Sequence, residues 1–544
     1  MTTPRSRRLG ELCAVVSLSV ALACLFTYPL VARLGHAGRA DTDDGRLSIW
    51  NVSWVARTLV VDPVHLFDAN VFYPNRTTLA YSESNFGAGL LAIPAYWASS
   101  RNPYVAHNAV VLLAFTLTAV GMYYLVRRLT RDRRAAAVSA VLFAFCPHVF
   151  GHTAHIQLLM TAGLPFSMLA FHRLVDKPGV SRGVQLGLAM AAQAVSCGYY
   201  GVFVLLIVGF AVVVVAVSRR WRAPEFWKGL AAGAVVAMAL VLPLFWPYLK
   251  LQQSTGFGRE LEEARRYSAD WRAYFASSSY AHAWILPLLG HWNEVLFPGF
   301  VATTFGLIGA WLAAKRGRRE LLAIYGGLTA LALWASFGPD AGFYTVLYAA
   351  LPLFAWLRAP SRFGLIVAFG LAVLSGIGLS MMLPKDRRGT IAASMVLALA
   401  VLDLRLGFPA FDVPAPSPAY RVLAMLPRGP VIEMPFYYLR GDFPKHTIYM
   451  LNSTTHWMPL VNGYSDHIPG EFLDRVDTLK YFPSRDAFAM LQRDHVRYAV
   501  FHMYGYNEQN RQDILGRLKQ FEDYLRPLYV DDDVRLYEIV GFPP

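Results

Sequence analysis

The sequence of 544 residues predicts a polytopic α-helical membrane protein with a small soluble α/β domain at its C-terminus. The composition predicts the membrane part, because 55% of the residues are hydrophobic and only 16% are charged, whereas soluble domains are about 25% charged. The hydrophobic residues also gather in stretches of about 20, the length that a helix needs to cross a bilayer. This composition excludes a disordered chain, and four cysteines are too few for a disulfide-rich scaffold.

Eleven apolar stretches are expected to cross the membrane as helices. The run 183–218 is too long for one helix, and the small-residue segment 196–201 divides it into two. The first stretch is interpreted as a signal anchor, because it lacks a clear small-residue cleavage site. The stretches are 11–32, 104–126, 135–150, 157–174, 183–197, 200–218, 229–249, 299–314, 320–337, 363–383 and 389–405.

Basic residues predict the orientation of these helices. Clusters of lysine and arginine lie at the N-terminus and after every even-numbered stretch, which is typical of cytoplasmic loops. The six basic segments hold 22 of the 50 lysines and arginines but only five acidic residues. The net charge of +14 therefore reflects topology rather than nucleic-acid binding, and the C-terminus is expected outside. These segments are 1–10, 127–134, 173–182, 219–228, 315–320 and 385–389.

The sequence divides into a transmembrane domain, 1–406, and a soluble outer domain, 407–544. The transmembrane domain contains a large outer loop, 33–103, in which Trp50 and Trp54 lie four residues apart on an amphipathic stretch. Tryptophan at this spacing suits a helix that lies in the membrane interface, and the apolar stretch 87–97 is too short to span. The soluble domain is expected to alternate strands at 431–434, 497–501 and 534–540 with helices at 486–494 and 507–524.

The first candidate site is the acidic cluster Asp41, Asp43 and Asp44 in the outer loop. A carboxylate at the membrane surface can act as a general base toward a hydroxyl or can bind a divalent cation. The alternative is a solvated acidic loop that only respects the charge asymmetry across the membrane. Spacing alone favours this alternative.

The second candidate site is the pair Arg358 and Arg362, which are spaced like neighbours on one helical face although Pro360 interrupts a simple helix. The guanidinium group binds phosphate through paired donors. The alternative is an interfacial anchor beside the tenth apolar stretch. Both interpretations place these arginines at the membrane surface.

Further polar residues lie at the outer ends of the apolar stretches. His155 and Gln157, with His148 and His152 nearby, suit a polar rim for an anionic head group, whereas zinc is disfavoured because no carboxylate lies close in sequence. Glu83 and Asn108 are expected to line a cavity or to form helix-end hydrogen bonds. No glycine-rich phosphate loop is present, so chemistry driven directly by ATP is not expected.

Several motifs together resemble the GT-C superfamily of bacterial membrane glycosyltransferases. The similarity includes the Asp-Thr-Asp motif of the outer loop and covers most of the chain. The matching segments are 41–43 with Trp50, 62–83, 151–159, 294–299, 357–363 and 456–464.

The resemblance implies a multi-span fold with a large first outer loop and an enzyme of the bacterial inner membrane that takes a sugar from a polyprenyl-phosphate donor. By matching position, Asp43 would be the base, with Asp41 as the neighbour that tunes or replaces it. Asp44, Glu83, Asn108, His155, Gln157, Arg358 and Arg362 would contact substrate. Transfer would invert the anomeric centre, no nucleic acid would take part, and the need for a divalent cation stays open.

Two alternatives from other functional classes remain at this point. A lipid-linked glycan transporter would also need many spans, but it would place charges or broken helices at the bilayer midplane. The stretches here are free of such charges, which favours an enzyme. A non-catalytic envelope assembly protein is the other alternative, and a search for an outer cavity distinguishes it.

Overall fold

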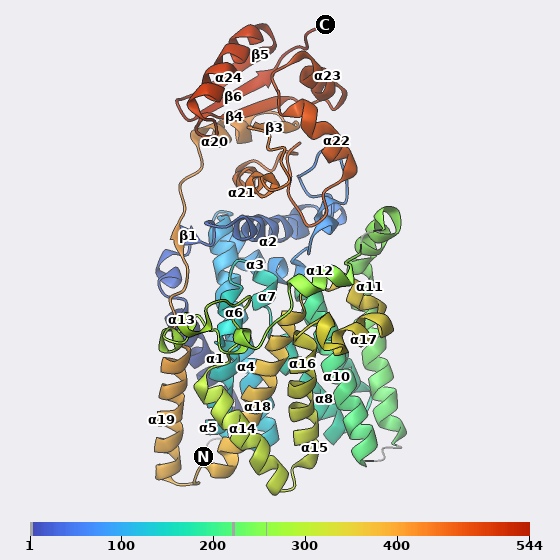
Figure 1. Cartoon of the computed structure of the whole chain (residues 1–544), viewed down its shortest axis with the longest axis vertical. Coiled ribbons are helices and arrows are strands. Elements are labelled where there is room, and N and C mark those ends of the chain that lie inside the picture. Colours follow the sequence, from blue (N-terminus) through green and yellow to red (C-terminus); the bar gives the residue numbers. More distant parts are fainter. Residues whose placement is uncertain (1–3, 220–222, 257) are drawn as a thin grey trace. The chain divides into compact units, whose positions relative to one another are not determined.

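The computed structural model describes residues 4–219, 223–256 and 258–544, so Arg220 and Arg222 of one predicted basic loop lie outside the described residues. The chain forms two compact units. The helical unit comprises residues 1–33 and 108–409, and the α/β unit comprises residues 34–107 and 410–544. Figure 1 labels helices and strands of both units.

The helical unit is built almost entirely of helices that run along one another. Its helices are α1 (Pro4–Phe26), α4 (Pro103–Thr130, whose first turn belongs to the α/β unit), α5 (Arg133–Ala144), α6 (Pro147–Gly151), α7 (Ile156–Leu159), α8 (Gly163–Asp176), α9 (Val180–Ser196), α10 (Gly198–Arg219), α11 (Pro224–Thr255), α12 (Leu261–Arg266), α13 (Leu286–Leu289), α14 (Phe300–Lys315), α15 (Arg319–Leu321), α16 (Gly327–Ser336), α17 (Phe343–Ala350), α18 (Gly364–Met382) and α19 (Arg387–Leu404).

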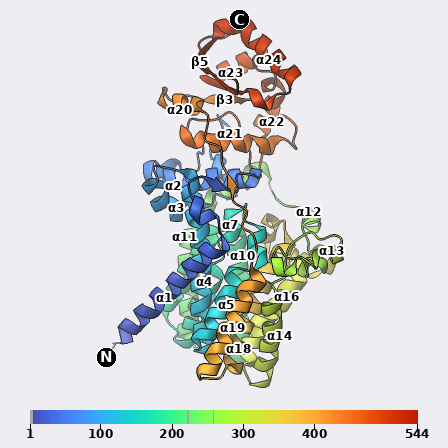
Figure 2. The ribbon, with the colours of Figure 1, turned by 90° about the vertical axis from the view of Figure 1, so that its left-hand side faces the viewer.

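Each of the eleven predicted apolar stretches contains helix, and the break between α9 and α10 falls inside the small-residue segment 196–201. Seven helical segments of the described chain are long and apolar enough to cross a membrane. The protein is therefore a polytopic helical membrane protein, while a total of eleven spans stays a prediction. The first of these segments is only 17% buried, and Figure 2 shows α1 leaving the other helices of its unit at an oblique angle.

Close packing of α9 against α11 depends on small residues. A Cβ added to Gly183 would lie 1.7 Å from the carbonyl oxygen of Gly229, and one added to Gly187 would lie 2.2 Å from that of Gly233. Such an approach of two backbones needs glycine, and small residues four apart are the usual means of helix association in membranes.

A buried polar group fixes the segment that precedes α14. His282 Nε2 lies 2.8 Å from Asp403 Oδ1, and its Nδ1 lies 2.8 Å from Ser277 Oγ. Asp403 Oδ2 accepts a hydrogen bond from the backbone N–H of Val301 in the first turn of α14, at 3.0 Å. Because His282 and Asp403 are both buried, this arrangement holds residues 277–301 against α19. That segment carries Glu294, which is discussed below.

The α/β unit consists of residues from both ends of the chain around one core. Its elements are β1 (Ala37–Gly38), α2 (Asp43–Val61), α3 (Phe86–Ala98), β2 (Phe411–Asp412), α20 (Pro418–Met425), β3 (Val431–Met434), α21 (Thr447–Asn452), α22 (Gly470–Leu479), α23 (Arg485–Arg493), β4 (Tyr498–His502), α24 (Glu508–Gln520), β5 (Leu525–Val530) and β6 (Val534–Ile539). The main sheet has the order β3-β4-β6-β5, with β3 parallel to β4 and the other neighbours antiparallel.

The bounds of several elements of this unit agree with those expected from the sequence. Strand β3 covers the four expected residues, and the ends of α23, β4 and β6 differ from the expected ends by at most one residue. The predicted helix 507–524 ends four residues early, at Gln520. Strand β5 was not predicted, because its exposed edge position and Pro527 remove the apolar pattern of a buried strand.

The unit boundary differs from the division at residue 406 that the sequence suggested, since residues 34–107 group with the C-terminal residues. The reason is a shared core. Trp50 and Trp54 of α2 are 3% and 5% exposed and contribute to the same hydrophobic cluster as β3, β4 and β6. The expectation that these tryptophans anchor a helix in the membrane interface is therefore wrong. Figure 1 shows α21 between α2 and the sheet.

A buried polar network crosses the middle of this core. Glu433 on β3 is fully buried, and its Oε2 accepts hydrogen bonds from Tyr420 OH at 2.6 Å and from His502 Nε2 at 2.7 Å. Asn462 bonds the backbone of Glu433 through both its amide oxygen and nitrogen, at 2.8 and 2.9 Å. Its Nδ2 also lies 3.2 Å from Nδ1 of His446, whose Nε2 lies 3.1 Å from the Tyr437 carbonyl oxygen.

Two histidines of this core predict that acid destabilises the α/β unit: His446 in the network, and His456, whose ring stacks on that of Tyr420 at 5.8 Å. Burial lowers the pKa of His446 to about 4, and burial followed by the nearby Arg428 lowers the pKa of His456 to about 3. An unfolded histidine has a pKa of about 6.5, so the unfolded state binds more protons between these values. Stability is expected to fall as the pH drops below about 6.5, until both histidines titrate in the folded state. Thermal unfolding of the full chain in detergent between pH 7 and pH 4 measures this slope.

The variant His446→Gln provides the control for that titration. It removes one of the protons that unfolding binds and is expected to unfold at lower temperature at pH 7 but with a shallower dependence on pH. A midpoint that stays constant from pH 7 to pH 4, or an unchanged slope in this variant, contradicts the assignment.

Candidate functional site

The candidate catalytic aspartates lie at the start of α2 in the α/β unit. Asp43 is the first residue of the helix, and Thr42 caps it by accepting a hydrogen bond from Gly45 N at 3.1 Å. Carboxylates in the first turn are stabilised by the partial positive charge of the helix N-terminus. A Cβ at Gly45 would lie 1.7 Å from the Arg39 carbonyl oxygen, so the turn that carries Asp41 packs directly on α2.

Two arginines hold the carboxylates of Asp41 and Asp43. Arg39 binds both oxygens of Asp41, with Nε 2.9 Å from Oδ1 and Nη2 3.3 Å from Oδ2. Arg46 forms an ion pair with Oδ1 of Asp43 and donates a hydrogen bond to the Ala40 carbonyl oxygen at 2.7 Å. The Asp43 side chain is 38% exposed, and its Oδ2 has no hydrogen-bond partner within the described residues. Asp43 therefore keeps one oxygen for a proton, whereas both oxygens of Asp41 are occupied.

Thr447 at the start of α21 completes the surroundings of Asp43. Its hydroxyl accepts a hydrogen bond from Arg46 Nε at 3.1 Å and lies 2.7 Å from the Pro444 carbonyl oxygen. The same hydroxyl lies 3.3 Å from Asp43 Oδ1, so its single hydrogen is shared between Pro444 and Asp43. Residues more than 400 positions apart in sequence thus fix the orientation of this carboxylate.

The variant Thr447→Val is expected to loosen the first turn of α2. Valine has nearly the same shape but lacks the hydroxyl that Arg46 binds, at a cost of about 1 kcal/mol for one hydrogen bond. Hydrogen exchange of peptides covering residues 43–47 should become about fivefold faster. Thr454→Val is the matched control, since among the described residues the Thr454 hydroxyl bonds only the Leu451 carbonyl oxygen, at 2.7 Å. Equal exchange in both variants contradicts the role of Thr447.

The other predicted residues of this unit lie near α2. Asp44 is the second residue of the helix and is exposed. The backbone oxygen of Glu83 accepts a hydrogen bond from Asn51 Nδ2 at 2.9 Å, which joins the loop before α3 to α2. The side-chain oxygens of Asn51 and of Asn85, the residue before α3, are buried and have no hydrogen-bond partner among the described residues.

In the helical unit, the predicted arginines lie on the turn before α18. Arg358 precedes a short 3-10 helix (Pro360–Phe363), so the two arginines do not share the face of an α-helix as their spacing suggested. The Arg358 guanidinium lies over the Tyr267 ring at 5.3 Å, and that of Arg362 over the Tyr199 ring at 4.6 Å. Stacking on aromatic rings holds the planar guanidinium groups of both arginines in place.

The backbone of this turn is fixed at two points. Tyr199 OH donates to the Ala359 carbonyl oxygen at 2.6 Å, and the backbone N–H of Ser361 donates to the Tyr267 carbonyl oxygen at 3.1 Å. The tyrosines that stack on the arginines thus also hold the peptide between them. This turn is a rigid support for two cationic groups.

A carboxylate and two histidines lie beside the turn. Glu294 Oε1 accepts a hydrogen bond from Ser361 Oγ at 3.3 Å, and Oε2 lies 3.7 Å from His152 Nε2. His152 Nδ1 donates to the His148 carbonyl oxygen at 2.8 Å, and the two imidazole rings lie 4.6 Å apart. Burial lowers the pKa of His152 while Glu294 opposes this shift, so the neutral ring is favoured at pH 7. Both nitrogens of buried His148 have no hydrogen-bond partner in the described part of the chain.

The remaining predicted residues also belong to the helical unit. His155 directly precedes α7 without a side-chain capping hydrogen bond, and Gln157 lies within this helix. Both are partly buried, while Asn108 is buried on α4. Among the described residues, no group of three or more histidine, cysteine, aspartate or glutamate side chains is placed to hold a metal ion.

Sequence reasoning missed Glu294 as a site residue and missed the arginines that bind the aspartates. Arg46 lies three residues after Asp43, a spacing at which side chains of a helix meet, so this pair was predictable from the sequence. Glu294 begins one of the segments that carry the family resemblance, but its partners His152 and Ser361 come from distant segments, so no spacing connected the three residues.

Solved structures resemble the whole chain. Arabinofuranosyltransferase AftD from Mycobacteria shares 15% identity with a TM-score of 0.56, covering 98% of this chain and 40% of AftD. ArnT from Cupriavidus metallidurans shares 14% identity with a TM-score of 0.50, covering 99% of this chain and 100% of ArnT. The chain thus spans less than half of the length of AftD. A comparison with curated protein sequences gives no match.

The chain therefore shares its overall fold with AftD and ArnT. At such low identity the likeness concerns the fold alone. The chain belongs to the family described as Domain of unknown function (DUF6311), whose model matches residues 62–405. The matched residues include Glu294 and both arginines of the turn, while the aspartates at the start of α2 precede them.

Proposed function

We propose that this chain is a membrane glycosyltransferase that moves a sugar from a polyprenyl-phosphate donor to an acceptor hydroxyl. The observation that carries the proposal is the GT-C-like fold, which extends over 99% of this chain and 100% of ArnT. A lipid-linked donor suits a chain with several membrane helices and no nucleotide-binding loop. The motifs of the sequence that resemble this superfamily support the same assignment.

In the proposed reaction Asp43 is the general base. Its unoccupied oxygen takes the proton of the acceptor hydroxyl while the hydroxyl oxygen bonds to the anomeric carbon of the sugar. The bond between this carbon and the phosphate oxygen breaks, and polyprenyl phosphate leaves with the electron pair. Attack opposite to the leaving group inverts the anomeric configuration. Arg46 holds the carboxylate in place, and Asp41 serves as its neighbour.

The arginine turn is proposed to bind the phosphate of the donor. Arg358 and Arg362 would offer paired donors to its oxygens, and they would stabilise the negative charge that grows as the sugar leaves. Glu294 and His152 would orient this turn through Ser361. Asp44, Glu83, Asn108, His155 and Gln157 are proposed to contact the donor or the acceptor.

We further propose that transfer takes place at the outer face of a bacterial inner membrane, with the N-terminus in the cytoplasm. The basic loops support this orientation, since they follow the even-numbered stretches. Labelling of single cysteines placed in the 127–134 and 385–389 loops of spheroplasts tests it. These sites should be protected from impermeant reagents, whereas a cysteine at exposed Asp474 should react.

A transfer assay with the purified full chain in nanodiscs tests the activity. The probes are polyprenyl-phosphate pentoses and hexoses labelled in the sugar, with delipidated bacterial envelope glycan as acceptor pool, with and without EDTA. We expect label to appear in the glycan with inverted configuration. Movement of intact donor across proteoliposome membranes without transfer would instead identify a transporter.

A further inference from the structure

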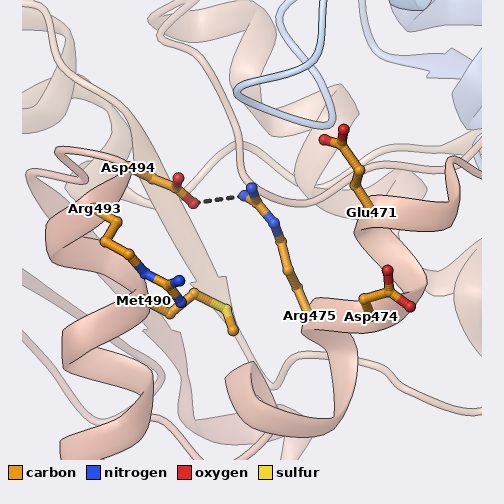
Figure 3. Close-up of a pocket in the computed structure, with 6 residues that line it drawn as sticks. All are labelled: Glu471, Asp474, Arg475, Met490, Arg493 and Asp494. Carbon is orange, nitrogen blue, oxygen red and sulfur yellow. Dashed lines mark hydrogen bonds and ion pairs between the residues drawn. The ribbon is translucent and has the colours of Figure 1, made fainter.

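A pocket of about 290 Å³ lies between α22 and α23 of the α/β unit. Figure 3 shows Arg475 reaching from α22 toward Asp494 at the end of α23, with Arg493 and Met490 beside them. Glu471 and Asp474 stand on the α22 side of the same pocket. Its volume is close to the lower limit for pockets that bind small ligands, about 300 Å³, and it suits a single sugar ring.

The inner wall of the pocket is an ion pair. Arg475 Nη1 lies 2.5 Å from Asp494 Oδ2, and the two side chains are 23% and 14% exposed. This contact joins α22 to α23 and fixes the shape of the pocket. Asp494 binds one nitrogen of the guanidinium group. The ion pair therefore fixes the direction of the remaining N–H donors of Arg475 and of the second acceptor oxygen of Asp494.

The rim carries both signs of charge, with the two acidic residues on α22 and the basic residue on α23. Glu471 and Asp474 are exposed carboxylates, and Arg493 is an exposed cation. An anionic ligand would be repelled by these two carboxylates, and a cationic ligand would be repelled by Arg475 and Arg493. A neutral ligand that both donates and accepts hydrogen bonds can use every group, as vicinal hydroxyls of a sugar do. Met490 supplies an apolar surface for the C–H face of such a ring.

We infer that this pocket binds a neutral sugar residue of a glycan. The identification of this glycan as the acceptor of transfer rests on the proposed function. The binding of sugar to the pocket does not depend on that function. None of the residues that line the pocket is among those to which the reaction is assigned, so the pocket would hold the acceptor by a part that does not react.

Binding of neutral oligosaccharides to the full chain in nanodiscs tests this inference. The probes are oligomers of three to six arabinose, galactose or mannose residues, measured by saturation-transfer NMR without donor. We expect at least one series to bind, and Asp474→Asn and Arg493→Met each to weaken its binding about tenfold. These two residues are exposed on the rim, so the variants keep the fold even where Arg475→Met does not.

Asp477→Asn is the matched control, since Asp477 lies on the same helix, pairs with Lys480 at 2.8 Å and is not part of the pocket. Unchanged binding in this variant supports the inference. Absence of binding by all three series, equal binding in the rim variants, or preferential binding of inorganic phosphate or spermine would overturn it. Oligosaccharide binding that persists in an Asp43→Asn chain devoid of transfer separates this inference from the proposed function.

Discussion

Asp43→Asn is expected to reduce the rate of sugar transfer by about 10²- to 10⁴-fold, the usual contribution of a general base. Asparagine has the same shape, so its side-chain oxygen can still accept hydrogen bonds from Arg46 and Thr447. Its amide cannot take the proton of the acceptor hydroxyl. Because binding of the donor does not require this proton transfer, KM for the donor should change little while kcat falls.

Asp41→Asn provides the comparison within the same loop. Arg39 binds both oxygens of Asp41, so Asp41 acts only through its effect on neighbouring groups. The rate of transfer by this variant should therefore fall less than tenfold. Asp62→Asn at the other end of α2 serves as the control for a lost surface carboxylate, because Asp62 pairs only with exposed His65 among the described residues. Full transfer by both Asp43→Asn and Asp41→Asn would show that neither of these two carboxylates is the base.

Arg362→Met has the second largest expected effect, a loss of about 10²- to 10³-fold in kcat/KM for the lipid-linked donor. Methionine keeps an apolar side chain against the Tyr199 ring but removes the donors proposed for the phosphate. Arg362→Lys should recover part of the loss, because it restores the charge but not the planar pair of donors. The measurement is transfer at varied donor concentration.

Arg266→Met is the control for this series, since Arg266 is an exposed arginine at the end of α12 in the same unit. It should leave kcat/KM unchanged. If Arg362→Met and Arg266→Met transfer sugar equally well, the turn before α18 does not bind the phosphate, and its cations serve as an anchor at the membrane surface.

The helices of this protein were predictable because their signals are local. An apolar stretch of sufficient length forms a helix whatever its neighbours, and the break at Ser196–Gly198 follows from small residues that lie next to each other. Strand β3 was recognisable for the same reason, as a short apolar run between turn residues. In each of these elements the sequence neighbours decide the conformation.

Features that depend on distant residues were not predictable. The amphipathic pattern of α2 suits a helix on a membrane surface as well as a helix on a protein core. The contact of Trp54 with Trp457, whose ring centroids lie 5.6 Å apart, shows that this helix packs on a protein core. Glu433 within a buried strand finds its partners Tyr420 and His502 on other elements. The surroundings of Asp43 likewise include Thr447, which no local pattern connects to it.

The most direct test of the account is the stoichiometry of transfer by the purified chain in nanodiscs. A donor with one label in the sugar and another in the polyprenyl phosphate follows both products of the broken bond in one experiment. The account predicts one polyprenyl phosphate released for each sugar that joins the glycan, with both products lost in Asp43→Asn. Release of polyprenyl phosphate without glycan labelling, or equal amounts of both products from the Asp43→Asn chain, would contradict it.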